Sequence, residues 1–245
     1  MKCAWKLGVV AAFCALPVAT SLSLAPGAQP AEASATLSLP LDPTTLEFFE
    51  VSLSNVVNRA LADEEANDGQ GGWTDQGPGC DMRGFGAGQK NYGGVPFRIL
   101  EPLSCVVLNS RQRPQSKLPQ RVTIPVNRRA DVLYVLHTGA LLISGRTNWT
   151  YVIHYTNGRQ SAIPVVPGVN VRNWEASNNP EFDNPPGMRT VPAPERVGNA
   201  LAPVCGAYIM EWLNPRRDTP IRAIEMISSG DGIPILLAIT GGVRQ

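Results

Sequence analysis

Ten short runs of aromatic, aliphatic and β-branched residues, each bounded by Gly, Pro, Asn or Asp, set the strongest limit on the fold of this chain. Such runs are typical of β-strands. Ten strands in about 200 residues suit two packed sheets, so we expect one all-β domain, a two-sheet antiparallel β-sandwich. The predicted strands are Phe48–Leu53, Val95–Leu100, Ser104–Leu108, Arg121–Val126, Asp131–His137, Trp149–Thr156, Gln160–Val165, Gly206–Trp212, Ile221–Ser228 and Ile233–Thr240.

Two of these runs predict more than a strand. In Trp149–Thr156 the aromatic and aliphatic residues alternate, and Asn157-Gly158 then separates the run from Gln160–Val165. Asn-Gly favours a type I′ turn, so we expect a hairpin here. Asp131–His137 is apolar at consecutive positions, which predicts a central strand covered on both faces.

Other segments predict little regular structure. Only Leu53–Glu65 has the spacing for a turn or two of helix, so we expect at most one short helix. Residues 175–205 are rich in proline and asparagine and lack an apolar period, which predicts a long loop.

The N-terminus predicts export. Lys2 and Lys6 precede an apolar stretch over Leu7–Val18, and small residues follow, which is the layout of a signal peptide. A membrane anchor is the alternative, but this stretch is shorter than the roughly 20 apolar residues that a bilayer requires. We therefore assign residues 1–24 to a signal peptide, with cleavage between 21 and 35, residues 25–45 to an Ala/Pro/Ser-rich linker, and 46–245 to the β-sandwich. The mature protein is expected to be secreted, periplasmic or at the cell surface, with no membrane span.

The charge balance limits the expected partners, and the cysteine count limits the expected disulfides. Removing residues 1–35 takes away two of 21 basic and one of 20 acidic residues, which leaves 19 of each. This balance favours neither nucleic acid nor an anionic membrane as partner. Three cysteines remain, Cys80, Cys105 and Cys205. They form either one disulfide with one thiol left over or three buried thiols, and the sequence leaves both open.

The segment 63–84 holds the densest polar chemistry, with six acidic residues among glycines. Hard cations such as calcium bind carboxylate and backbone oxygens, which a glycine-rich loop can present. Asp63 and Asp68 are the candidate ligands of a structural calcium. The alternative is that these carboxylates cap turns through hydrogen bonds to the backbone.

Trp73 lies within this polar segment and suggests a sugar site. Sugars stack their C–H faces on aromatic rings and need polar partners for their hydroxyls. A second candidate platform is Trp174, beside Arg172. In the alternative, Trp73 anchors the loop internally and Asp75 pairs with Arg83. The candidate ligand-binding residues are Trp73, Asp75, Gln76, Asp81, Arg83, Arg172 and Trp174.

The order of these segments resembles a known family. Phe48–Val51, Gly72–Pro78, Asp81–Gly84 and Gly94–Phe97 are similar, in this order, to β-sandwich modules of the galactose-binding-like type, and the similarity continues through residues 133–228. Such modules are attached to secreted bacterial glycoside hydrolases and lyases, and many hold a structural calcium. The resemblance implies a jelly-roll fold and a non-catalytic role in binding a glycan or glycoconjugate, although no catalytic domain accompanies the module here.

Two other function classes stay open. A Gly-x-Ser-x-Gly nucleophile motif and the spacings of common metal sites are missing, so we expect no catalytic residues and no required cofactor. A glycan-acting enzyme needs only two carboxylates, however, and Asp75, Asp81 or Glu211 are candidates. We instead expect Glu211 to point away from the core, either into solvent or onto the backbone of a neighbouring segment. A structural or protein-interaction module at the envelope is the third class, and it predicts an exposed apolar patch.

Overall fold

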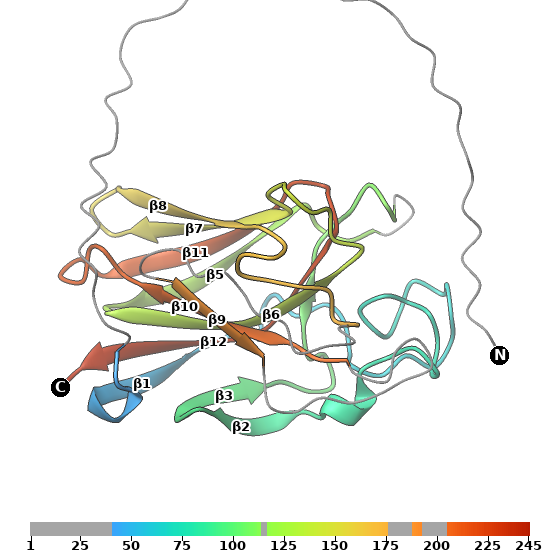
Figure 1. The fold of residues 1–245 in the computed structure, drawn as a ribbon, viewed down its shortest axis with the longest axis horizontal. Helices are drawn as coiled ribbons and strands as arrows, with labels where there is room; N and C mark the ends of the chain where they lie inside the picture. The colour runs from blue at the N-terminus through green and yellow to red at the C-terminus, as the bar shows by residue number, and fades with distance from the viewer. Residues whose placement is uncertain (1–40, 114–116, 176–187, 193–204) are drawn as a thin grey trace, which may run out of the picture. The chain divides into compact units, whose positions relative to one another are not determined.

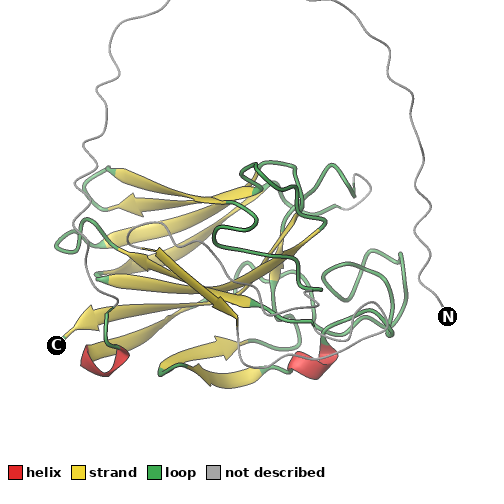
Figure 2. Cartoon of the chain, in the orientation of Figure 1, coloured by secondary structure: helices red, strands yellow, loops and turns green. Residues whose placement is uncertain are grey.

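The computed structural model describes residues 41–113, 117–175, 188–192 and 205–245. The signal peptide and most of the linker and of the 175–205 loop lie outside these residues. The described part consists of strands and loops with two single turns of 3-10 helix, η1 (Pro43–Thr45) and η2 (Arg83–Phe85) (Figure 2). The strands are β1 (Leu46–Val51), β2 (Gly88–Tyr92), β3 (Val95–Ile99), β4 (Val106–Val107), β5 (Arg121–Arg128), β6 (Val132–Ala140), β7 (Trp149–Tyr155), β8 (Gln160–Val165), β9 (Met188–Pro192), β10 (Tyr208–Leu213), β11 (Ile221–Ser228) and β12 (Ile233–Arg244).

The strands form two large antiparallel sheets and one small one. The first sheet has the order β1-β12-β6-β10-β9, with β4 also paired to β12, and the second has the order β5-β11-β7-β8. Eight of these strands have the orders β1-β12-β6-β10 in the first sheet and β5-β11-β7-β8 in the second, which are the strand orders of the two sheets of a jelly roll. The all-β sandwich and its jelly-roll type are therefore confirmed.

The first sheet lies in the middle of three layers (Figure 1). The second sheet covers one of its faces, and the β2-β3 hairpin covers the other, where β3 packs against β12 and β1. Successive residues of β6 therefore enter different cores: Tyr134 belongs to the cluster on the hairpin side, and Leu133 and Val135 to the cluster between the two large sheets. All of β6 is buried, as its continuous apolar run predicts.

The predicted hairpin is present, but its turn differs. Trp149, Tyr151 and Ile153 of β7 alternate into the core and pair with β8. Of the two turn residues only Gly158 has a positive φ, 82°. A type I′ turn needs positive φ at both positions, so the predicted turn type is wrong.

All ten predicted strands are present, and the structure adds two. β2 contains mostly polar residues, and β9 lies inside the segment that we predicted to be a continuous loop; β9 pairs with β10. Leu53–Glu65 forms turns and not a helix. Residues 41–45, which we assigned to the linker, contain η1 and the buried Leu41, so part of that segment packs with the domain.

Candidate functional site

A cavity of the described part lies among the loops at one end of the sandwich. One wall comes from the connection between β1 and β2, which includes Arg59, Asp68, Trp73 and Asp75. The other wall comes from residues in 108–113 and 117–119, between β4 and β5. The cavity has a volume of about 810 Å³. This size falls within the range of small-ligand sites.

Two consecutive glycines shape the first wall. Gly71 and Gly72 have φ values of 48° and 49°, in the left-handed region that side chains disfavour. A Cβ atom on Gly72 would lie 2.7 Å from the Cβ of Asp63, closer than atoms can approach. The Gly72 amide donates to the carbonyl of Ala62 at 2.8 Å. The glycine pair thus lets the loop fold back over the Asp63 side chain.

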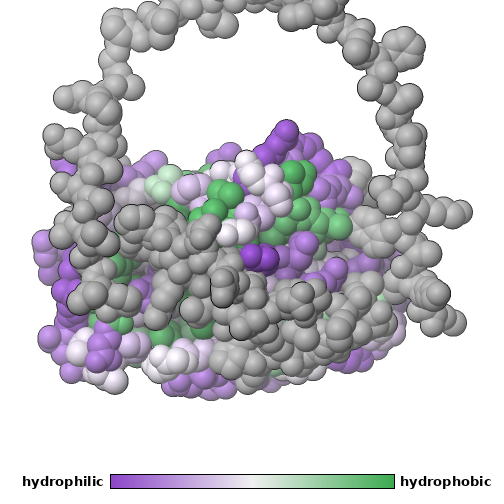
Figure 3. Space-filling model, viewed as in Figure 1, coloured by the Kyte–Doolittle hydropathy of each residue, from purple (hydrophilic) through white to green (hydrophobic). Residues whose placement is uncertain are grey.

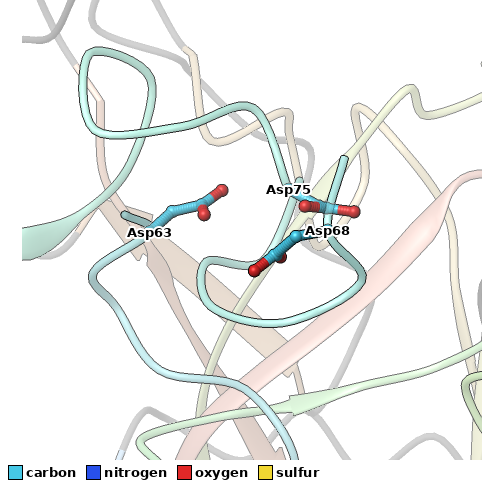
Figure 4. Close-up of side chains that lie close together, drawn as sticks. All are labelled: Asp63, Asp68 and Asp75. Carbon is cyan, nitrogen blue, oxygen red and sulfur yellow. The ribbon is translucent and has the colours of Figure 1, made fainter. Parts of the chain in front are cut away.

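Asp63, Asp68 and Asp75 converge on one point of this loop (Figure 4). One carboxylate oxygen from each residue lies within 4.8 Å of the others. Asp63 is 1% exposed, and its Oδ2 accepts a hydrogen bond from the Gly77 amide at 2.9 Å. The Oδ1 atoms of Asp63 and Asp75 are buried and have no hydrogen-bond partner. Three converging carboxylates with two unsatisfied oxygens cost free energy unless something positive binds them.

The cluster fits a calcium ion. Calcium binds oxygen atoms at about 2.3–2.6 Å, so two of its ligands lie up to about 5 Å apart. The spacing of the three carboxylates falls within this limit. Asp63 and Asp68, the two residues expected as ligands, are both in the cluster, and Asp75 joins them. Bound calcium would neutralise the carboxylates and fix the loop that forms the cavity wall.

Asp81 and Arg83 stabilise the loop through hydrogen bonds and do not line the cavity. Asp81 accepts hydrogen bonds from the Asp63 amide at 2.9 Å and from Arg83 Nε at 2.7 Å. Arg83 also donates to the carbonyl of Asp63 at 3.0 Å and pairs with Glu64 at 3.1 Å. The hydrogen bond with Asp81 raises the pKa of Arg83. The expected alternative pairing of Arg83 with Asp75 is therefore wrong, because each finds another partner.

The two candidate tryptophans pack against each other. Their rings meet edge to face, with centroids 5.3 Å apart. Trp174 is fully buried, so its prediction as an exposed sugar platform is wrong: the apolar ring completes the core on the hairpin side. Trp73 is 3% exposed and lines the cavity as a wall, not as an open platform. Arg172 is exposed and Gln76 is half-buried, and neither lines the cavity.

Three cationic residues that sequence analysis missed do line it. Arg59, Arg113 and Lys117 come from both walls. Nη1 of Arg113 lies 3.8 Å from Oδ2 of Asp75, and its Nη2 donates to the Asp75 carbonyl at 3.4 Å. Burial lowers the pKa of Arg113, which the Asp75 charge partly offsets. No local motif marks Arg113 and Lys117, because they lie about 40–50 residues from the acidic loop and only the fold joins them.

No family model and no curated protein matches this sequence.

Two other residues that could take part in catalysis, His137 and Glu211, are buried. His137 is buried between the Tyr151 hydroxyl at 3.1 Å and the Asn170 carbonyl at 3.0 Å, and burial lowers its pKa to about 4. Glu211 is only 3% exposed, so the solvent-facing position, one of the two surroundings that we expected for it, is wrong. It lies on β10, which pairs with β6 along one edge and with β9 along the other.

The three cysteines of the domain are buried. Cys80, Cys105 and Cys205 form no disulfide with one another, so the alternative of buried thiols describes them. Cys105 is fully buried, and this raises its pKa to about 12. A thiol in this state is a poor nucleophile at neutral pH.

Within the described residues, no helix has the length and apolar character needed to cross a membrane.

Proposed function

We propose that this protein is an exported, non-catalytic carbohydrate-binding module whose ligand occupies the cavity between the acidic loop and residues 108–113 and 117–119. The observation that supports this most directly is the cavity itself, about 810 Å³ in volume and lined by both polar and apolar groups. Binding sites for small ligands combine apolar walls with a few polar groups that orient the ligand.

The chemistry of the lining suits a sugar. Trp73, Leu108 and Ile233 supply apolar wall for C–H faces. Gln112 and Lys117 are exposed in the cavity lining and supply polar groups for hydroxyls. The jelly-roll fold agrees with the resemblance to galactose-binding-like modules, and the N-terminal sequence pattern supports export.

The competing functions have less support in the described residues. Figure 3 shows hydrophobic residues between hydrophilic margins on one face, but among the described large hydrophobic side chains only Leu103 is exposed, at 43%. An interaction surface would need a contiguous apolar patch. An enzyme that uses two carboxylates has less support as well, because Asp81 is hydrogen-bonded to Arg83 and to a backbone amide and Glu211 is buried in the middle sheet.

We further propose that calcium binds Asp63, Asp68 and Asp75 as a structural cofactor of this module. Its role is to hold the cavity wall, since Asp68 and Asp75 belong both to the acidic cluster and to the cavity lining. No residue of the chain is assigned a catalytic step.

Glycan binding by the purified protein, measured on an array with calcium present, tests the proposal. Gln112→Ala removes one exposed lining group, and Gln89→Ala, at an exposed position of β2, is the matched control. One lost hydrogen bond should weaken binding about 2–10-fold, and the control should bind as the wild type does. The proposal fails if the folded protein binds no glycan, or if both variants bind equally well.

A further inference from the structure

Arginines gather at the end of the sandwich opposite the cavity. Three segments meet there: residues 127–131, from the end of β5 to β6, residues 156–159, between β7 and β8, and residues 214–222, between β10 and the start of β11 (Figure 1). These segments hold six of the 19 basic residues that follow residue 35, but only two acidic residues, Asp131 and Asp218. The six, which we call the arginine cluster, are Arg128, Arg129, Arg159, Arg216, Arg217 and Arg222.

Nearby carboxylates neutralise only part of this charge. Glu47 of β1 pairs with Arg128 at 2.9 Å, and Oδ1 of Asp131 lies 3.9 Å from Nε of Arg217. Three other members of the cluster are exposed and form no ion pair with a residue that the structure describes: Arg129, Arg159 and Arg222. Basic and acidic residues balance over the mature chain, so this end of the domain carries a local excess of positive charge.

Strand pairing brings the cluster together. Ile221 pairs with Arg128 on one side and with Tyr155 on the other. Neighbouring strands lie about 4.8 Å apart, so the three ends span only about 10 Å. A register shift after Ile221 leaves the exposed Arg222 outside both ladders, and the carbonyl of Arg159 accepts from the Tyr155 amide at 2.9 Å. The arginines therefore form a row across β5, β11 and β7, with neighbours within about one Debye length.

Arg216 is held in position beside this row. Its guanidinium carbon lies 5.9 Å from the centre of the Tyr155 ring. Oδ1 of Asn214 accepts hydrogen bonds from the Arg216 amide at 2.9 Å and from the Tyr155 hydroxyl at 2.6 Å. A side chain that is already ordered loses less entropy when it binds a ligand. The planar fork of a guanidinium also matches two oxygens of a carboxylate or a sulfate, and the cluster contains no lysine.

The chemistry of this end favours a linear anionic polymer over a lipid bilayer. Like charges at such spacing repel one another and create a potential that attracts polyanions. Groups in a row can contact successive charges along one chain. Binding at a membrane surface usually buries apolar side chains as well. In these three segments, all of which the structure describes, no large hydrophobic side chain is exposed.

We propose that the arginine cluster is a second binding surface, for a linear acidic polysaccharide whose carboxylate or sulfate groups pair with the row of arginines. This surface is separate from the cavity. Val132, the first residue of β6, pairs with Leu213 at the cluster end, whereas Ala140, the last, pairs with the cavity residue Ile233. Nine residues of strand span about 30 Å, so either surface can bind its ligand without the other.

The test is calorimetric titration with four probes. They are a uronate oligosaccharide, the same chain with its carboxylates methyl-esterified, a sulfated oligosaccharide, and vesicles of phosphatidylcholine and phosphatidylserine in equal parts. Arg159→Gln combined with Arg222→Gln removes two exposed cations from the row. The matched control combines Arg98→Gln on β3 with Arg146→Gln between β6 and β7, two exposed arginines outside the cluster. Both double variants are checked for wild-type thermal unfolding.

We expect at least one acidic oligosaccharide to bind at least tenfold more tightly than the ester, because hydrogen bonds to charged groups contribute more than neutral ones. The uronate and sulfate probes then identify which anionic group is preferred. The double variant of the cluster should bind the acidic probe about fivefold more weakly, and the control should bind it as the wild type does. Its affinity should also depend less steeply on salt, since fewer ion contacts are made.

Equal binding of the acidic probes and the ester would overturn the proposal, and so would an equal loss in the two double variants, since net charge alone would then explain it. Tighter binding of the vesicles than of either acidic probe would overturn it in favour of a membrane surface. Gln112→Ala separates the two sites, because Gln112 lines the cavity. If this variant weakens binding of the acidic probe and the cluster variant does not, the acidic chain binds in the cavity and the cluster is rejected. Loss of acidic binding in the cluster variant alone supports the second surface, whatever the cavity binds.

Discussion

Replacing Asp63 by asparagine tests the calcium cluster most directly. Asp63→Asn preserves the size of the side chain and an oxygen that can accept from the Gly77 amide, but it removes one of three converging negative charges. The substitution should therefore have opposite effects with and without calcium. Without calcium it relieves repulsion among the carboxylates, and with calcium it removes a ligand.

The size of the effect follows from linkage. Calcium at 100 times its Kd stabilises the folded state by about 2.7 kcal/mol. For a domain of about 200 residues, 1 kcal/mol corresponds to about 2–4 °C in Tm, so calcium should raise the wild-type Tm by about 5–10 °C. If the variant binds calcium about 100-fold more weakly, the same concentration equals its Kd and contributes only about 0.4 kcal/mol, or roughly 1 °C.

The assay is thermal unfolding of the wild type and Asp63→Asn, each in excess chelator and in calcium. Asp218→Asn is the control, because Asp218 is an exposed aspartate outside the cluster. In chelator, Asp63→Asn should unfold at the wild-type temperature or above it. A wild-type Tm that does not respond to calcium, or a calcium response of the same size in Asp63→Asn, would refute the argument.

Two further predictions concern buried groups. Burial lowers the pKa of His137 from about 6.5 in the unfolded chain to about 4, so the unfolded state binds more protons between these two pH values. The free energy of unfolding should therefore fall by about 3 kcal/mol in all as the pH drops from 6.5 towards 4. A proton NMR titration of this imidazole with a midpoint near 6.5 would contradict this. A thiol reagent at pH 8 should modify Cys80, Cys105 and Cys205 only after denaturant unfolds the domain, since all three are buried; modification of the folded protein within minutes would show that they are accessible.

Much of the fold was predictable because strand patterns are local. The alternation in β7 and the continuous apolar run in β6 follow from burial on one face and on both faces. β2 and β9 escaped prediction because their residues show no apolar alternation. Each is a strand through its backbone pairing, β2 with β3 and β9 with β10.

The candidate site was predictable only in part, because only some of its residues are close together in the sequence. The acidic residues of the 63–75 loop are close in sequence, so their convergence was expected for Asp63 and Asp68 and extends to Asp75. The two tryptophans could not be assigned from sequence, because an exposed ring and a buried ring have the same local pattern. Their edge-to-face contact joins residues about 100 positions apart.

The sequence by itself determined ten of the twelve described strands, the antiparallel sandwich and the glycine-rich acidic loop, since these depend on residue type and on neighbours along the chain. Only the tertiary structure decided which residues face the cavity. Arg113 and Lys117 line the same cavity as the acidic loop because the chain between β4 and β5 lies at the same end of the sandwich. Such contacts depend on how distant segments pack, and no local pattern encodes that packing.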